Sequence, residues 1–88
     1  MRTYYLEPKY DSAKSFYKKA WVRENDDYTT DLISYSTKVA TINKNTIPAT
    51  CNINGIYSAT TLRHIKEFLR QNDMPCGSKK DIINMYMN

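Results

Sequence analysis

The feature that most constrains the fold is one stretch with helical periodicity, residues 57–71, in a chain that otherwise alternates like β-strands. With about 3.6 residues per turn, four apolar side chains of this stretch gather on one side of a helix, and three basic side chains lie beside them. The apolar side consists of Leu62, Ile65, Phe68 and Leu69, and the basic stripe of Arg63, Lys66 and Arg70. The apolar side predicts packing against a sheet, whereas the basic stripe requires solvent or an anionic partner.

Three stretches before this helix carry β-forming residues with a period of two, which predicts three strands over residues 11–23, 32–42 and 46–54. The connections between them are short, so neighbouring strands should run antiparallel. Pro48 has no N–H to donate, and the third strand should therefore lie at an edge or begin late. The structure of the N-terminal segment stays open, with a fourth strand as one alternative.

Capping residues in the sequence indicate where the two predicted helices begin. Ser58 is positioned to cap the helix of residues 57–71 by accepting a backbone N–H of its first turn. Ser78 and Asp81 have the spacing of a capping box, which predicts a short second helix with an apolar side at Ile82, Ile83 and Tyr86.

Together these elements predict an α+β fold in one small domain, residues 1–88: an antiparallel sheet of three, or four, strands packed on one main helix, with a short C-terminal helix. Strand alternation and the helix stripe define the side chains expected inside. These are Phe16, Ala20, Val22, Ile33, Tyr35, Val39, Ile47, Cys51, Ile53, Leu62, Ile65, Phe68 and Leu69.

The opposite face of the predicted sheet should be free to bind a partner. An antiparallel sheet can expose one face to water without any function. Trp21 is the exception, because a large apolar ring on a solvated face is costly unless something covers it. Either the N-terminal segment or the C-terminal helix covers Trp21, or a partner does. The candidate partner-binding residues are Tyr17, Lys19, Trp21, Arg23, Lys38, Asn52 and Asn54, with Ser34, Ser36 and Thr50 on the same face.

The sequence lacks the residue patterns of an active site or a metal site. The single histidine, His64, lies in the middle of the predicted helix, where we expect a structural role. Cys51, His64 and Cys76 do not have the spacing of zinc ligands, and two glycines do not make a phosphate-binding loop. We therefore predict a protein that is not an enzyme, with no catalytic residues, no metal and no cofactor.

Composition fits a cytoplasmic binding protein. The chain has 88 residues, a net charge of +4, eight tyrosines and one tryptophan, a combination that suits nucleic-acid and protein surfaces equally. No stretch approaches the ~20 apolar residues of a membrane span, and no signal peptide is recognisable. We expect cytosolic reduced thiols at Cys51 and Cys76, with their pairing left open.

Three blocks of the sequence resemble, in order, a family of small proteins of unknown function from bacteriophages and mobile elements of Gram-positive bacteria. The blocks are YDSAKSFYKKAWV, LISYSTKVATI and GIYSATTLRHIKEFLRQNDMPCGSKKDIINMYM. The family pattern leads us to expect a Gly-Phe pair after the helix, where this chain has Asp73 and Met74. The resemblance implies a phage accessory protein, a setting in which small inhibitors of host defence nucleases, such as anti-CRISPR proteins, are prominent.

Three functions follow as alternatives. The first is a non-catalytic modulator of a host protein or protein–nucleic-acid complex, with inhibition of a defence nuclease as the expected activity. The second is a small nucleic-acid-binding module that places Lys19, Arg23 and Lys38 on phosphates and Asn52 or Asn54 on base edges. The third is a structural or oligomerising domain. The sequence leaves the partner, the oligomeric state and the choice between sheet face and helix stripe undecided.

Overall fold

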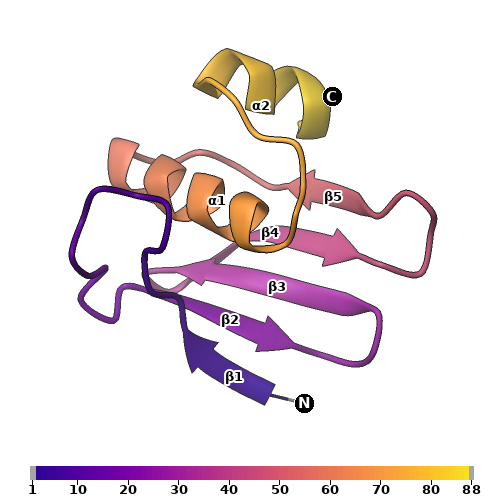
Figure 1. The fold of residues 1–88 in the computed structure, drawn as a ribbon, viewed down its shortest axis with the longest axis horizontal. Helices are drawn as coiled ribbons and strands as arrows, with labels where there is room; N and C mark the ends of the chain where they lie inside the picture. Colours follow the sequence, from indigo (N-terminus) through magenta and orange to yellow (C-terminus); the bar gives the residue numbers. More distant parts are fainter. Residues whose placement is uncertain (1, 88) are drawn as a thin grey trace.

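The computed structural model describes residues 2–87, which form five strands and two helices. The strands follow one another across a single antiparallel sheet in the order of the chain. Helix α1 crosses one face of this sheet, and α2 lies beyond the last strand (Figure 1). The elements are β1 (Arg2–Tyr5), β2 (Ala20–Glu24), β3 (Thr29–Ser34), β4 (Thr37–Asn43), β5 (Thr50–Ile53), α1 (Ala59–Gln71) and α2 (Lys79–Tyr86).

The prediction of three or four strands on one main helix is wrong, chiefly because the stretch 32–42 is two strands. A two-residue turn at Tyr35 and Ser36 reverses the chain, so that Ser34 pairs with Thr37. Two-residue hairpin turns need a positive φ at their first central residue, usually supplied by Gly or Asn. Here Tyr35 adopts a φ of 60°. A tyrosine gives no turn signal, which is why the hairpin could not be recognised in the sequence.

The first predicted strand also begins later than expected, and the N-terminal segment contributes a strand of its own. Residues 11–19 form a loop, in which Tyr17 and Lys18 have positive φ angles of 54° and 63°. Such angles interrupt an extended strand, so β2 starts only at Ala20. Residues 2–5 pair with β2 as the edge strand β1. At the other edge β5 begins at Thr50, after Pro48, which confirms the prediction made from this proline.

The core lies between the sheet and the two helices. Most of the predicted inward residues are buried there, including Ile65, Phe68 and Leu69 of α1, whereas Leu62 and Cys51 are half-buried. Three assignments are wrong. Ile33 is buried on the opposite face, Tyr35 is exposed in the turn, and Ile47 is fully exposed in the loop before β5. The core also includes Ile82 and Tyr86 from the predicted apolar side of the second helix. Leu6, Leu32, Ala40 and Ile42 join it without having been identified by the alternation.

Both predicted helix starts are confirmed. The Ser58 hydroxyl accepts the backbone N–H of Thr61, and Ser78 and Asp81 form a reciprocal capping box. These bonds satisfy N–H groups that have no partner inside the helix.

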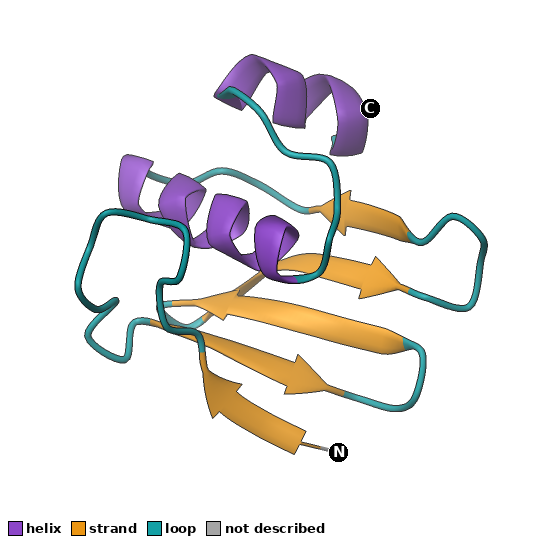
Figure 2. Cartoon of the chain, viewed as in Figure 1, coloured by secondary structure: helices purple, strands orange, loops and turns teal. Residues whose placement is uncertain are grey.

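Residues 6–19 form a loop that passes beside α1 and that we call the strap (Figure 2). The strap is fastened to α1 through a buried carboxylate. Glu67, only 1% exposed, accepts the backbone N–H groups of Tyr10 (3.0 Å) and Asp11 (2.9 Å), and Gln71 donates to its second oxygen (2.6 Å). Burial raises the pKa of Glu67, but the hydrogen bonds from Gln71 and the strap outweigh it, so the pKa lies below its ordinary value. The carboxylate therefore stays charged and holds the strap in place.

Candidate functional site

The face of the sheet turned away from α1 is the candidate site, and we call it the open face. Its members follow from β3, where the Ser34 side chain contacts α1 and the alternate residues Asp31 and Ile33 point the other way. Residues directly opposite each other in neighbouring strands share a face. The open face therefore carries Thr3, Tyr5, Trp21, Arg23, Asp31, Ile33, Lys38, Thr41, Asn43, Thr50 and Asn52.

One half of the open face is aromatic. Trp21 on β2 is opposite Tyr5 on β1, with 6.5 Å between the ring centroids. Trp21 remains 37% exposed and Tyr5 50% exposed, although the indole N–H donates to the carbonyl oxygen of Tyr35 (3.4 Å). The Lys18 ammonium lies 5.8 Å from the centroid of the Tyr5 ring. Strand β1 thus covers part of Trp21, and the two rings leave an amphipathic surface that a partner can cover.

The charges in the middle of the open face are paired with each other. Arg23 Nη2 donates to Asp31 Oδ2 at 2.9 Å, and Asp31 also accepts from Asn25 (2.9 Å) and Thr41 (2.6 Å). Burial raises the pKa of Asp31, but the bonds from Thr41, Asn25 and Arg23 outweigh it and keep the pKa below its ordinary value. Arg23 is therefore committed to a buried carboxylate, whereas Lys38 is exposed.

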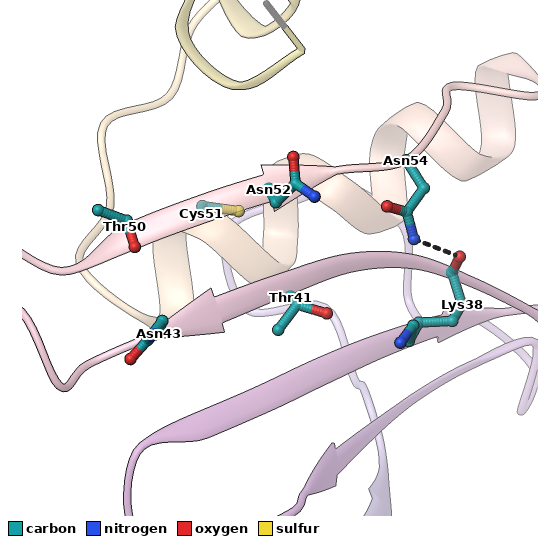
Figure 3. Close-up of a pocket in the computed structure, with 7 residues that line it drawn as sticks. All are labelled: Lys38, Thr41, Asn43, Thr50, Cys51, Asn52 and Asn54. Carbon is teal, nitrogen blue, oxygen red and sulfur yellow. Dashed lines mark hydrogen bonds between the residues drawn. The ribbon is translucent and has the colours of Figure 1, made fainter.

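The other half of the open face is a polar hollow between β4 and β5 with a volume of about 460 Å³. Figure 3 shows its amide and hydroxyl side chains, with Asn54 donating to the carbonyl oxygen of Lys38 (3.1 Å). Among the described residues that line the hollow, Lys38 is the charged one. The polar lining consists of Lys38, Thr41, Asn43, Thr50, Asn52 and Asn54.

The structure brings together five of the seven predicted partner-binding residues. Trp21, Arg23 and Lys38 lie on the open face, and Asn52 and Asn54 line the hollow beside them. Tyr17 and Lys19 are exposed but belong to the loop before β2. The other predicted members lie as follows: Ser34 is buried against α1, Ser36 lies in the turn and Thr50 is on the open face.

The basic stripe of α1 is partly neutralised by the strap. Arg63 Nε donates to Asp11 Oδ2 (3.1 Å), and a second bond joins Arg63 Nη2 to Asp11 Oδ1. The hydrogen bond from Arg63 holds the pKa of Asp11 down at about 2. Lys66 is half-buried and Arg70 is exposed, so the stripe presents less positive charge than the sequence indicates.

His64 is fully buried between the sheet and the strap. Its Nδ1 lies 2.8 Å from Ser34 Oγ, and its ring meets Phe16 edge-on at a centroid distance of 4.6 Å. Desolvation lowers the pKa of His64, so the neutral form is favoured. No sequence pattern indicated the contact between His64 and Ser34, because the two residues are thirty positions apart. A Ser–His pair without access to solvent is placed to stabilise the fold, and the non-enzyme assignment stays a prediction.

Over residues 2–87 the structure contains no group of three or more potential metal ligands, and both cysteines are free thiols. Burial raises the pKa of Cys51 to about 12, which keeps that thiol protonated and unreactive at neutral pH. Neither helix in this part of the chain has the length and apolar character needed to cross a membrane.

Comparison with known proteins identifies the family but no function. Searches of curated proteins and of solved structures found no match. The model of the family described as "Family of unknown function (DUF8033)" matches residues 4–84. This match spans all seven elements except the first two residues of β1 and the last two of α2. The chain therefore belongs to the DUF8033 family.

Proposed function

We propose that this protein is a non-catalytic binding module that docks the aromatic half of its open face on a partner protein. The observation that carries the proposal is the exposed pair of Trp21 and Tyr5, which lie opposite each other on strand β2 and the edge strand β1. Tryptophan, tyrosine and arginine dominate the energetics of protein interfaces, because they bury a large area at a small cost in conformational entropy. Ile33, which pairs with Trp21 on the open face, is buried beneath these side chains and adds little exposed apolar area.

The pairing of charges favours a protein over a nucleic acid as the partner. The nucleic-acid alternative places Lys19, Arg23 and Lys38 on phosphates. Of these, Arg23 already has its guanidinium bound to Asp31. The Arg23–Asp31 ion pair loses little interaction energy when a protein covers it. Phosphates, in contrast, would have to compete with the buried Asp31 carboxylate for Arg23. Inhibition of a host defence nuclease in the host cytoplasm is the activity we propose first, on the resemblance to small phage proteins.

Nucleic-acid binding is the second candidate, and the polar hollow is the observation that favours it. Amide side chains recognise base edges, and Lys38 in the same hollow could contact a phosphate. Trp21 and Tyr5 would then stack on bases instead of entering a protein interface.

The test compares Trp21→Ala with Tyr28→Ala, because Tyr28 is a comparably exposed aromatic residue in the turn between β2 and β3. Both variants should fold. Affinity purification from the lysate of a Gram-positive host, with nuclease treatment, should recover a protein partner with the wild type and Tyr28→Ala but not with Trp21→Ala. In an assay with a purified CRISPR nuclease, the wild type and Tyr28→Ala should inhibit cleavage, and Trp21→Ala should not.

Salt dependence decides between the two candidates. Three phosphate contacts would give a log–log slope of about −2 to −3 for the binding constant against salt, and a mainly apolar protein interface a slope close to zero. If every partner is lost on nuclease treatment and the slope is steep, the protein-interface proposal is wrong and the nucleic-acid candidate replaces it. Equal recovery with Trp21→Ala and the wild type contradicts both.

A further inference from the structure

Strand β5 is an edge strand whose outward backbone groups are unpaired. The Asn54 N–H donates to Val39 O of β4 at 2.8 Å. Because N–H and C=O directions alternate along an antiparallel strand, Asn52 and Thr50 also face β4, and Cys51 between them faces away. Within residues 2–87 no hydrogen bond reaches the outward N–H and C=O of Cys51. The edge therefore offers a donor and an acceptor to another strand.

An apolar groove adjoins this edge on the side of the helices. It has a volume of about 390 Å³ and lies between the start of β5 and α2, which Figure 2 shows beyond β5. None of the residues within 2–87 that line it carries a charge. Met85, one of its lining residues, is 43% exposed. The apolar lining consists of Pro48, Ala49, Met74, Pro75, Met85 and Tyr86.

We propose that β5 and this groove bind an extended peptide segment of another protein by strand addition, with an apolar side chain of the peptide in the groove and acidic side chains on the open face. Strand geometry determines which peptide side chains face the groove and which face the open face. The Cys51 side chain points to the helix side of the sheet, opposite to Asn52, so the side chain of a peptide residue paired with Cys51 also points to the helix side, where the groove lies. Its two neighbours must then point to the open face.

Charge selects the flanking residues of the peptide. The polar hollow on the open face is lined by Thr50 and Asn52 of the same strand, and the charged side chain of Lys38 lines it as well. A carboxylate on a neighbouring peptide residue can pair with this ammonium, whereas a lysine there would be repelled. The preferred segment therefore alternates apolar and acidic residues. A second copy of β5 pairs less well, because its own open-face residues are uncharged amides and hydroxyls.

A defined peptide tests the proposal with the intact chain. The probe is acetyl-Gly-Glu-Val-Glu-Val-Glu-Gly-amide, and its counterpart has lysine in place of each glutamate. In nitrogen–proton correlation spectra the acidic probe should shift the amide signals of Cys51 and Ile53, with a dissociation constant about tenfold lower than that of the lysine peptide.

Backbone methylation of the probe checks strand addition directly. The N–H groups that would bond to β5 belong to the valines, since these pair with outward-facing residues. N-methylation of both valines should weaken binding about tenfold, and N-methylation of the central glutamate should leave it unchanged. Equal effects at the two positions would refute pairing with β5.

Variants of the protein supply a matched control. Cys51→Pro removes the outward N–H, at the one kind of strand position that tolerates proline, and Cys51→Ala keeps it. Binding should fall about tenfold in Cys51→Pro relative to Cys51→Ala. Lys38→Glu should reverse the preference between the two peptides, and Trp21→Ala should bind the probe normally, which separates this site from the aromatic half of the open face.

Two results would overturn the proposal. One is the absence of amide shifts at β5 with the acidic probe at millimolar concentration. The other is a dimer of the unliganded wild type, detected by sedimentation, that Cys51→Pro but not Cys51→Ala dissociates, because the edge is then occupied by a second copy of this chain.

Discussion

The hydroxyl oxygen of Ser34 on β3 lies 2.8 Å from Nδ1 of His64 on α1, and both residues are buried. This contact joins the central strand of the sheet to the helix through a polar pair, in addition to the aliphatic packing of Leu32 in the same core as Ile65 and Leu69. Since the pair is closed off from solvent, the protonation of His64 is coupled to folding.

His64 should make folding sensitive to mild acid. Its folded pKa lies below the ordinary value of about 6.5, so the unfolded chain binds the proton first. The stabilisation is full above pH 6.5 and is lost as the pH falls through the lower folded pKa. The free energy of unfolding in urea should therefore drop from pH 7 to pH 5 in the wild type and drop less in His64→Gln. Parallel curves for the two proteins would contradict this.

The buried carboxylate of Glu67 should be essential for holding the strap. Glu67→Gln introduces donor hydrogens next to the Gln71 amide and the strap N–H groups, which should cost about 1–3 kcal/mol of unfolding free energy at pH 7. Limited proteolysis should cleave the strap faster in this variant. Glu7→Gln is the control, because the Glu7 side chain is exposed and makes only a 3.5 Å contact with Ser15. Unchanged proteolysis of Glu67→Gln would contradict the role of this carboxylate.

Protonation of Glu67 and Asp11, the two carboxylates that join the strap to α1, should lower the stability of the fold at a more acidic pH than protonation of His64 does. The pKa of Glu67 is below its ordinary value, and that of Asp11 is about 2. Groups with lowered pKa values stabilise the fold above their unfolded pKa and lose that contribution as the pH falls through the folded pKa. Stability should therefore decline further from about pH 4.5 towards pH 2. Glu67→Gln should show a shallower decline over this range in thermal melts.

Ile65 should be a stability determinant of the core, because it is fully buried on the apolar side of α1. Ile65→Ala should cost roughly 2–4 kcal/mol, and the volume-conserving Ile65→Leu less than about 1.5 kcal/mol. Chemical denaturation at pH 7 measures both. Equal midpoints for Ile65→Ala and the wild type would show that α1 does not pack as described.

The turn at Tyr35 should be strained by its positive φ of 60°. Tyr35→Gly and Tyr35→Ala both remove the ring, but only glycine adopts this angle without a steric penalty. We therefore expect the glycine variant to be about 1 kcal/mol more stable than the alanine variant. A more stable alanine variant would mean that the turn is not under strain.

The sequence by itself determined the elements whose signals are local. The apolar stripe of α1, the serine caps of both helices and the late start of β5 after Pro48 follow from the spacing of a few neighbouring residues. The open face was recognisable in part for the same reason, because strand alternation placed Trp21 and Arg23 together.

Only the tertiary structure decided the rest, because the deciding contacts join distant residues. The turn at Tyr35 adopts a backbone angle that tyrosine does not signal, and it splits one expected strand into two. The contact of Ser34 with His64 on α1 then places the neighbouring Ile33 on the open face. Arg23 and Arg63 appeared free in the sequence but are bound by Asp31 and Asp11, the second of them 52 residues away. Burial likewise made Glu67 a structural anchor, since a carboxylate can be placed in a core only where several donors converge on it.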